Sequence, residues 1–231
     1  MRVARAAGAL LLALAAAPRA RAQEFLDRGT FVIERAGIEV GREDFAIRRT
    51  VGSGGGAGIL AVATIHYRDR DLRPALELTG GLVPLSYQVD VSTGGRVTER
   101  FSAQFARGRI AARLATQQRE VLHEFPVPAA VAVLDDDAFH QYYFLPRAAA
   151  GGTRTVHLLR PRGPALVEAQ VERVGPDTVT INGRILAADR YALRIGEAEE
   201  RRFWFTSDGD LLRVAEPARA IVATRIALPP H

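Results

Sequence analysis

The fold is decided by Leu85-Ser86-Tyr87-Gln88-Val89-Asp90-Val91, a stretch in which apolar and polar side chains alternate. A period of two places the apolar residues on one face and the polar residues on the other, as in a half-buried β-strand. The alternation resumes over Val97–Phe105, after the turn sequence Thr93-Gly94-Gly95, with Glu99 as the one misplaced polar residue. Two alternating segments joined by a glycine-containing turn predict a β-hairpin.

Similar hairpins are expected along most of the chain. Asn182-Gly183 joins Val179–Ile181 to Arg184–Leu186, and Asn-Gly favours a turn with positive φ at both central residues. Asp208-Gly209 separates another pair of apolar segments in the same way. Further strands are expected at Phe31–Arg35, Ile38–Arg48, Ile59–Tyr67, Ala75–Leu78, Val167–Glu172, Phe203–Thr206, Leu211–Val214 and Ala220–Ala227. The pattern predicts about a dozen strands or a few more, paired antiparallel.

The strand count predicts an all-β fold built on one large curved antiparallel sheet. A twisted sheet of more than ~10 strands curls, splits into two layers or closes, so a half-barrel or open barrel with one short helix is expected. Its concave face would then be apolar, lined by Leu85, Tyr87, Val89, Phe101, Ala103, Phe105, Val167, Ala169 and Val171. Such a hollow accepts an apolar ligand. The alternative is that small residues face large ones and the interior fills itself.

One segment, Leu134–Leu145, breaks the strand pattern and predicts a short helix. Asp135-Asp136-Asp137 stands before an aromatic-rich run, and aspartates suit a helix start both as caps and against the helix dipole. On a helix Phe139, Tyr142 and Tyr143 share one side, so the helix is expected to be amphipathic. A proline-marked loop, Phe125–Pro128, precedes it.

The first 22 residues read as a secretory signal peptide. Arg2 and Arg5 precede an apolar run that ends at Pro18 and is followed by Ala20-Arg21-Ala22. The run is too short to cross a bilayer as a helix, and the sequence has no cysteine to carry a lipid. We therefore expect a mature chain of residues 23–231, folded as a single antiparallel β domain. It would be periplasmic or secreted, with no transmembrane anchor after cleavage.

The composition excludes several kinds of chemistry. The chain has no cysteine and no lysine, so all 31 basic residues are arginine. Thiolate nucleophiles, disulfides, zinc knuckles and lysine Schiff bases are therefore excluded. Removing the four arginines of the leader leaves 27 basic against 26 acidic residues, so the charge gives no reason to expect a nucleic-acid partner. No cofactor and no metal site are expected from the sequence.

The best candidate for a polar site is the segment Asp135, Asp136 and Asp137 together with His140. On a helix beginning at Asp136, either Asp136 or Asp137 lies on the same face as His140 and could orient its imidazole as a general base. The alternative is a solvated helix cap without a function in catalysis. The candidate ligand-binding side chains are Tyr87, Phe101, Phe105, Asp135, His140, Tyr142, Tyr143 and Trp204.

Three stretches together resemble a known group of proteins. They are Gly37–Phe45, Val133–Tyr142, and Trp204 with Asp208–Val214. They resemble exported bacterial β-proteins that are grouped as domains of unknown function. The resemblance implies a large curved antiparallel sheet, similar to the half-barrels of periplasmic lipoprotein carriers, and it brings no catalytic residues. Those carriers close their hollow with substantial helices, whereas this chain has one short helix to serve as a lid.

The sequence thus predicts an exported binding protein without enzymatic activity. Its curved sheet would offer an apolar concavity to a lipid-like or other apolar small ligand, or to a protein partner at the cell envelope. Two alternatives stay open. One is a hydrolase that uses Asp136 or Asp137 with His140, and the other is a structural or adaptor protein that docks partners through its sheet edges.

Overall fold

The computed structural model describes residues 24–51, 55–106, 108–127, 131–148, 154–196 and 199–228. The expected signal peptide, residues 1–22, lies outside them. No helix in these ranges is long and apolar enough to cross a membrane.

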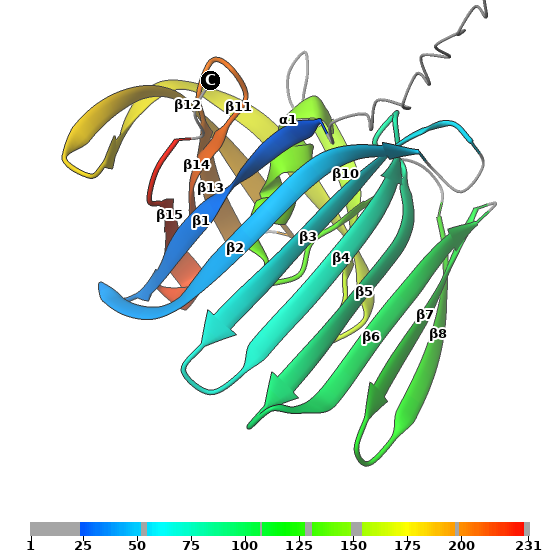
Figure 1. The fold of residues 1–231 in the computed structure, drawn as a ribbon. Coiled ribbons are helices and arrows are strands. Elements are labelled where there is room, and N and C mark those ends of the chain that lie inside the picture. Colours follow the sequence, from blue (N-terminus) through cyan, green and yellow to red (C-terminus); the bar gives the residue numbers. More distant parts are fainter. Residues whose placement is uncertain are drawn as a thin grey trace, which may run out of the picture.

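Over these ranges fifteen strands form one continuous sheet (Figure 1). The strands are β1 (Phe25–Arg35), β2 (Ile38–Val51), β3 (Ala57–Tyr67), β4 (Asp71–Thr79), β5 (Pro84–Thr93), β6 (Arg96–Ala106), β7 (Arg109–Thr116), β8 (Glu120–Pro126), β9 (Val131–Val133), β10 (Arg154–Arg160), β11 (Ala165–Ile181), β12 (Arg184–Ile195), β13 (Glu199–Phe205), β14 (Leu211–Glu216) and β15 (Ile221–Arg225).

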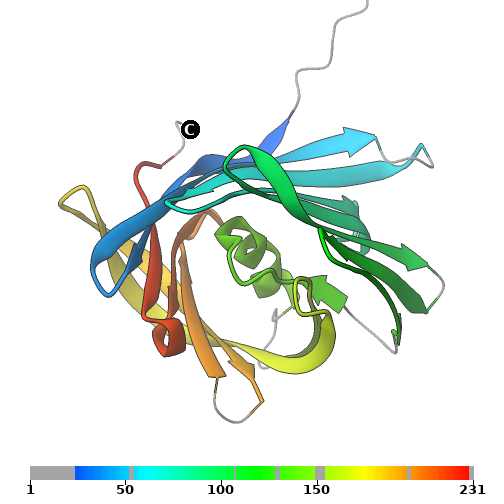
Figure 2. The ribbon, with the colours of Figure 1, turned by 90° about the horizontal axis from the view of Figure 1, so that it is seen from below.

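The sheet is built from two arms. Strands β1 to β8 form an N-terminal arm and β9 to β15 a C-terminal arm, each with consecutive strands side by side. The arms join where β1 pairs with β15, so β8 and β9 are the two edges of the sheet. All pairs are antiparallel except β9 with β10, which is parallel. The sheet curls without closing (Figure 2), which confirms the predicted open-barrel, all-β class.

The hairpin that decided the fold forms between β5 and β6. Val89 lies opposite Phe101 and Tyr87 opposite Ala103, and these side chains are buried. A register shift between Val91 and Ser92 interrupts the alternation near the turn. Val97 lies beyond it and is 47% exposed. The buried face of this hairpin therefore ends before the residues of the turn.

The turn between β11 and β12 also has the predicted conformation, because Asn182 and Gly183 have φ values of 49° and 76°. The strands around it are longer than predicted. The segments expected at Val167–Glu172 and Val179–Ile181 belong to one strand, β11, which continues through a register shift between Arg173 and Gly175. Gly175 has a φ of 136°, and such a bulge lets a long strand bend without ending.

The predicted helix is wrong in its start and in its environment. A 3-10 helix, η1, spans Phe139–Phe144 and runs into a single α-helical turn, α1, at Leu145–Ala148. All six residues of η1 are buried, because the sheet curls around this segment (Figure 2). The helix therefore fills the interior of the sheet, and it is not an amphipathic lid. The loop expected at Phe125–Pro128 starts later, since β8 continues to Pro126, and Pro128 lies outside the described residues.

Candidate functional site

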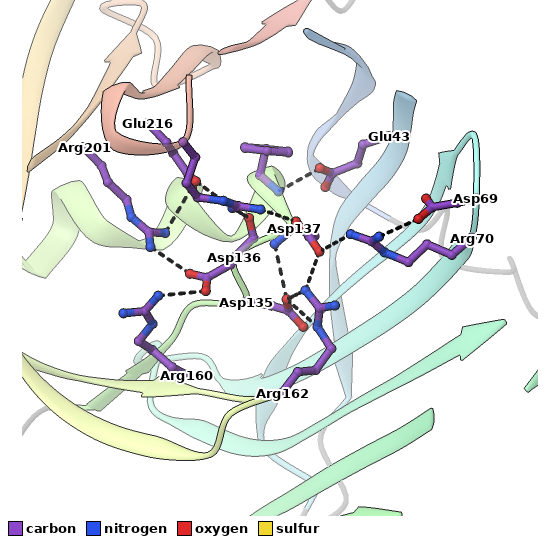
Figure 3. Close-up of polar contacts among 12 residues, drawn as sticks. Glu43, Asp69, Arg70, Asp135, Asp136, Asp137, Arg160, Arg162, Arg201 and Glu216 are labelled. Carbon is purple, nitrogen blue, oxygen red and sulfur yellow. Dashed lines mark hydrogen bonds and ion pairs between the residues drawn. The ribbon is translucent and has the colours of Figure 1, made fainter. Parts of the chain in front are cut away.

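The three aspartates form an acidic segment, Asp135–Asp137, that lies just before η1 and is surrounded by arginines (Figure 3). The carboxylate of Asp137 has three arginine partners. Its Oδ1 accepts a hydrogen bond from Arg219 at 2.6 Å. Its Oδ2 accepts from Arg162 at 2.6 Å and from Arg70 at 2.9 Å. The side chain of Asp137 is only 4% exposed, so these are charge-assisted bonds shielded from water.

The two other aspartates are held in the same way. Asp135 accepts hydrogen bonds from Arg162 at 2.8 Å and from the hydroxyl of Tyr87 at 3.0 Å. Asp136 accepts from Arg160 and from Arg201, each at 2.7 Å. Arg201 also donates a hydrogen bond to Glu216, and the same carboxylate accepts a hydrogen bond from the hydroxyl of Tyr142.

These partners come from both arms of the sheet. Arg70 stands in the turn before β4, while Arg160 and Arg162 lie at the end of β10 and in the turn that follows. Arg201 belongs to β13, and Arg219 to the 3-10 turn η2 (Pro217–Arg219). The network therefore ties the interior segment to the N-terminal and C-terminal arms at once.

The charges around the acidic segment shift several pKa values. Burial alone would raise the pKa of Asp137, but Arg162 and Arg219 outweigh it and hold that pKa well below its usual value. Burial would also raise the pKa of Asp136, but hydrogen bonds from Arg201 and Arg160 outweigh it and lower that pKa. Burial dominates at Glu216 and raises its pKa despite Arg201 and Arg219. Asp136 and Asp137 are therefore weak proton acceptors.

The start of η1 is capped from a distant strand. Ala138, at the N-cap position, makes no side-chain cap bond. Instead the carboxylate of Glu43 on β2 accepts the backbone N–H groups of Phe139 at 2.7 Å and His140 at 3.0 Å. Asp135 contributes to the preceding turn, where its Oδ1 accepts the N–H of Asp137. The expectation that the aspartates cap the helix is therefore wrong.

His140 has a partner that the sequence did not indicate. Its Nδ1 bonds to Glu43, and its ring stacks on Phe45 with centroids 6.1 Å apart. The residue is fully buried, and its Nε2 has no hydrogen-bond partner within the described part of the chain. Asp136 and Asp137 face arginines instead, so the geometry does not favour an Asp136–His140 or Asp137–His140 pair as a catalytic base. In the same part of the chain, no group of three or more His, Asp or Glu residues is arranged to hold a metal ion.

Most of the aromatic candidates pack in the interior. Tyr87, Phe101, Tyr142 and Tyr143 are buried in the main core. Trp204 packs in a second, smaller cluster, where its Nε1 donates to Asp177 at 3.0 Å and Arg213 lies over its ring. These rings stabilise the fold, and a ligand could contact them only if the packing of the core changed.

An apolar pocket of about 630 Å³ remains where the sheet does not close. Strands from both arms line it together with η1 and α1. The residues that line this pocket are Leu76, Leu78, Gly81, Leu82, Val83, Pro84, Leu85, Phe105, Ala106, Gly108, Arg109, Val127, Val131, Ala132, Val133, Phe144, Arg147, Arg154, Thr155 and Val156. Of the predicted ligand-binding residues only Phe105 belongs to it. Leu85, which was expected on the apolar concave face, also lines it. Sequence reasoning missed the remaining lining residues because they come together only when the two edges of the sheet approach each other.

Comparison with known proteins extends no further than the fold. Neither a scan against family models nor a search of curated proteins found a match. Among solved structures, the chain is similar to the beta-barrel-like protein of domain of unknown function DUF1849 from Brucella abortus. The TM-score is 0.53 with 9% sequence identity, and the match covers 91% of this chain and 100% of the other. The chain thus has the fold of a bacterial beta-barrel-like protein of a domain of unknown function, as its sequence pattern predicts.

Proposed function

We propose that this chain is a binding protein without enzymatic activity, which takes the apolar part of a lipid-like ligand into the apolar pocket. The observation that carries the proposal is the pocket itself. Its volume of about 630 Å³ lies within the ~300–1,000 Å³ typical of pockets that enclose a small ligand.

The lining of the pocket supports an apolar ligand. Most of its residues are aliphatic or aromatic, and Leu76 and Val133 continue directly into the buried core. Covering apolar surface of this kind contributes about 25 cal/mol per Å² removed from water. The rest of the interior is filled by η1 and its aromatic side chains, so this pocket is the place within the described residues where a ligand meets apolar walls of useful size.

The leader-like sequence of residues 1–22 supports a ligand-binding function outside the cytoplasm. A carrier or sensor of lipid-like molecules at the cell envelope would combine such a leader with an apolar pocket. A protein partner at the envelope would be the donor or acceptor of the ligand.

The proposal is tested with the neutral fluorescent probe Nile red and the purified protein. Ala132 on β9 lines the pocket, so Ala132→Phe should fill part of it and weaken probe binding about tenfold or more. Ala111→Phe is the matched control, because Ala111 is exposed on β7 and does not line the pocket. Both variants should keep the far-ultraviolet circular dichroism of the wild type.

Two results would overturn the proposal. One is the absence of any fluorescence enhancement with the wild-type protein. The other is equal probe binding by the Ala132→Phe and Ala111→Phe variants, which would place the probe elsewhere on the surface.

A further inference from the structure

The charges on the apolar pocket have one sign. Three arginines line it, Arg109, Arg147 and Arg154, and its lining contains no aspartate or glutamate. A pocket that only buried hydrocarbon would have no need of charged side chains in its lining. The lining therefore combines apolar walls with positive charge.

Two of these arginines have no carboxylate partner in the part of the chain that the structure describes. Arg109 pairs with Glu124 at 3.5 Å. Arg147 instead lies over the ring of Tyr143, 5.0 Å from its centroid, and donates a hydrogen bond to the Tyr143 hydroxyl at 3.4 Å. Among the described residues, neither Arg147 nor Arg154 forms an ion pair. Arg154 precedes Val156 by two residues on β10, and Val156 is buried, so the two side chains leave the strand on the same, inner face.

The arginines around the acidic segment differ from Arg147 and Arg154, because they have carboxylate partners within the protein. Arg70, Arg160, Arg162, Arg201 and Arg219 each bind at least one carboxylate within 3 Å. These five arginines therefore have carboxylate partners, whereas Arg147 and Arg154 have none within the described residues.

We infer that the pocket binds a single-chain amphiphile with an anionic headgroup, of the fatty-acid class. This inference rests on the proposed function and specifies its ligand. The alkyl chain lies along the apolar walls, and the carboxylate meets Arg147 and Arg154, whose planar guanidinium groups suit it. A volume of about 630 Å³ lies within the range of pockets that enclose one small ligand, which suits a single alkyl chain.

The test compares three ligands that share a sixteen-carbon chain and differ in headgroup charge. Hexadecanoate, hexadecanol and hexadecyltrimethylammonium each compete with Nile red for the wild-type protein. The anion should bind most tightly and the cation least. In the Arg147→Gln/Arg154→Gln double variant, the affinity for hexadecanoate should fall about three- to tenfold, as expected for two solvent-exposed charge pairs. The affinity for hexadecanol should not change.

Arg113→Gln is the matched control. Arg113 is exposed, pairs with Glu120 at 2.6 Å and does not line this pocket, so its removal should change neither affinity. Equal affinities of wild type for the three ligands, or equal losses for hexadecanoate and hexadecanol in the double variant, would overturn the inference and leave the proposed function standing. Failure of all three ligands to displace bound Nile red would show that the probe site is not an alkyl-chain site and overturn both.

Discussion

Asp137 shows how strongly a single residue is fixed in this fold. Its carboxylate is 4% exposed and is shared by Arg70, Arg162 and Arg219. Removing one partner of a buried ion pair leaves the other charges without compensation, and this typically costs ~3–5 kcal/mol. The residue therefore stabilises the position of the interior segment.

We expect Asp137→Asn to lower the free energy of unfolding at pH 7 by about 3 kcal/mol or more. The measurement is urea-induced unfolding followed by circular dichroism. Asp69→Asn is the control, because Asp69 also pairs with Arg70 but is 71% exposed, and its loss should have little effect. Equal effects of the two substitutions would contradict the prediction.

The same residue should give the stability of the protein a dependence on pH. The pKa of Asp137 is lower in the folded protein than in the unfolded chain. Its contribution is therefore present above about pH 4 and is lost as the pH falls below that value toward the folded pKa. Glu216 acts in the opposite sense, because its raised pKa favours proton uptake by the folded state. Wild type should lose more stability than Asp137→Asn between pH 4.5 and pH 3.

Sequence reasoning identified the acidic segment but not its partners. The three consecutive aspartates before an aromatic run are visible in the sequence. Their arginines are 24 to 82 residues away, and a local pattern carries no information about contacts over such separations. For the same reason the pairing of His140 with Glu43, 97 residues apart, could not be predicted.

At the level of elements, η1 depends on a strand for its cap. The first N–H groups of a helix need acceptors, and here Glu43 of β2 supplies both oxygens. A helix of six residues is too short to be stable by itself. Its position inside the sheet and its cap thus explain why it forms.

We expect Glu43→Ala to lower the free energy of unfolding by about 3 kcal/mol, because it leaves two buried backbone donors and His140 without an acceptor. Hydrogen exchange at the amides of Phe139 and His140 should become faster at the same time. Glu39→Ala on the same strand is the control, since Glu39 is exposed and its carboxylate pairs with Arg42 three residues away. Unchanged amide protection at Phe139 and His140 would refute the proposed role of the cap.

The strands were the elements most accessible to prediction. Alternation located β5 and β6, because a half-buried sheet imposes its period directly on the sequence. The Asn182-Gly183 dipeptide located the turn between β11 and β12, because it favours positive φ. Some strand ends were predicted too short, since alternation fades where a strand extends beyond the core. Strand β2, for example, continues past Arg48 to the exposed Val51. The 3-10 helix was mistaken for an amphipathic helix because His140 and Gln141 suggest a polar face, whereas both side chains are buried.

At the scale of the molecule, the two arms are joined by β1 and β15. Arg225 of β15 is fully buried there and bonds to Asp27 at 2.7 Å and to the carbonyl of Leu211 at 3.2 Å. Its guanidinium lies directly against Gly29 of β1. A Cβ at Gly29 would lie 2.7 Å from Nη2 of Arg225. Glycine is therefore required for the two strands and the buried arginine to fit together.

We expect Gly29→Ala to destabilise the protein by ~1–3 kcal/mol, as overpacking of a tight interior does. Arg225 cannot move aside without breaking its bonds to Asp27 and to the backbone. Gly163→Ala is the control, because a Cβ at Gly163 would meet nothing within 4 Å. Equal thermal midpoints for the two variants would show that the side chain of Arg225 can move away from residue 29 at little energetic cost.

The order of the strands was beyond prediction from the sequence. Alternation shows that strands form and turns show that chain neighbours pair, but neither shows that the first and last strands meet. The position of the apolar pocket depends on the pairing of β1 with β15 and on the approach of β9 to the N-terminal arm. The residues that line the pocket could therefore not be predicted either.

The pairing of β1 with β15 also divides the folding of the chain into two kinds of step. Each other pairing in the described sheet joins strands that follow one another in the chain, so each arm can assemble from contacts between chain neighbours. Phe31 and Arg225, by contrast, meet across almost the whole polypeptide, and closing so long a loop carries the largest entropic penalty. During synthesis or translocation from the N-terminus, the middle of the sheet is consequently the last part to be completed, and until then each arm exposes an unpaired strand at its inner border.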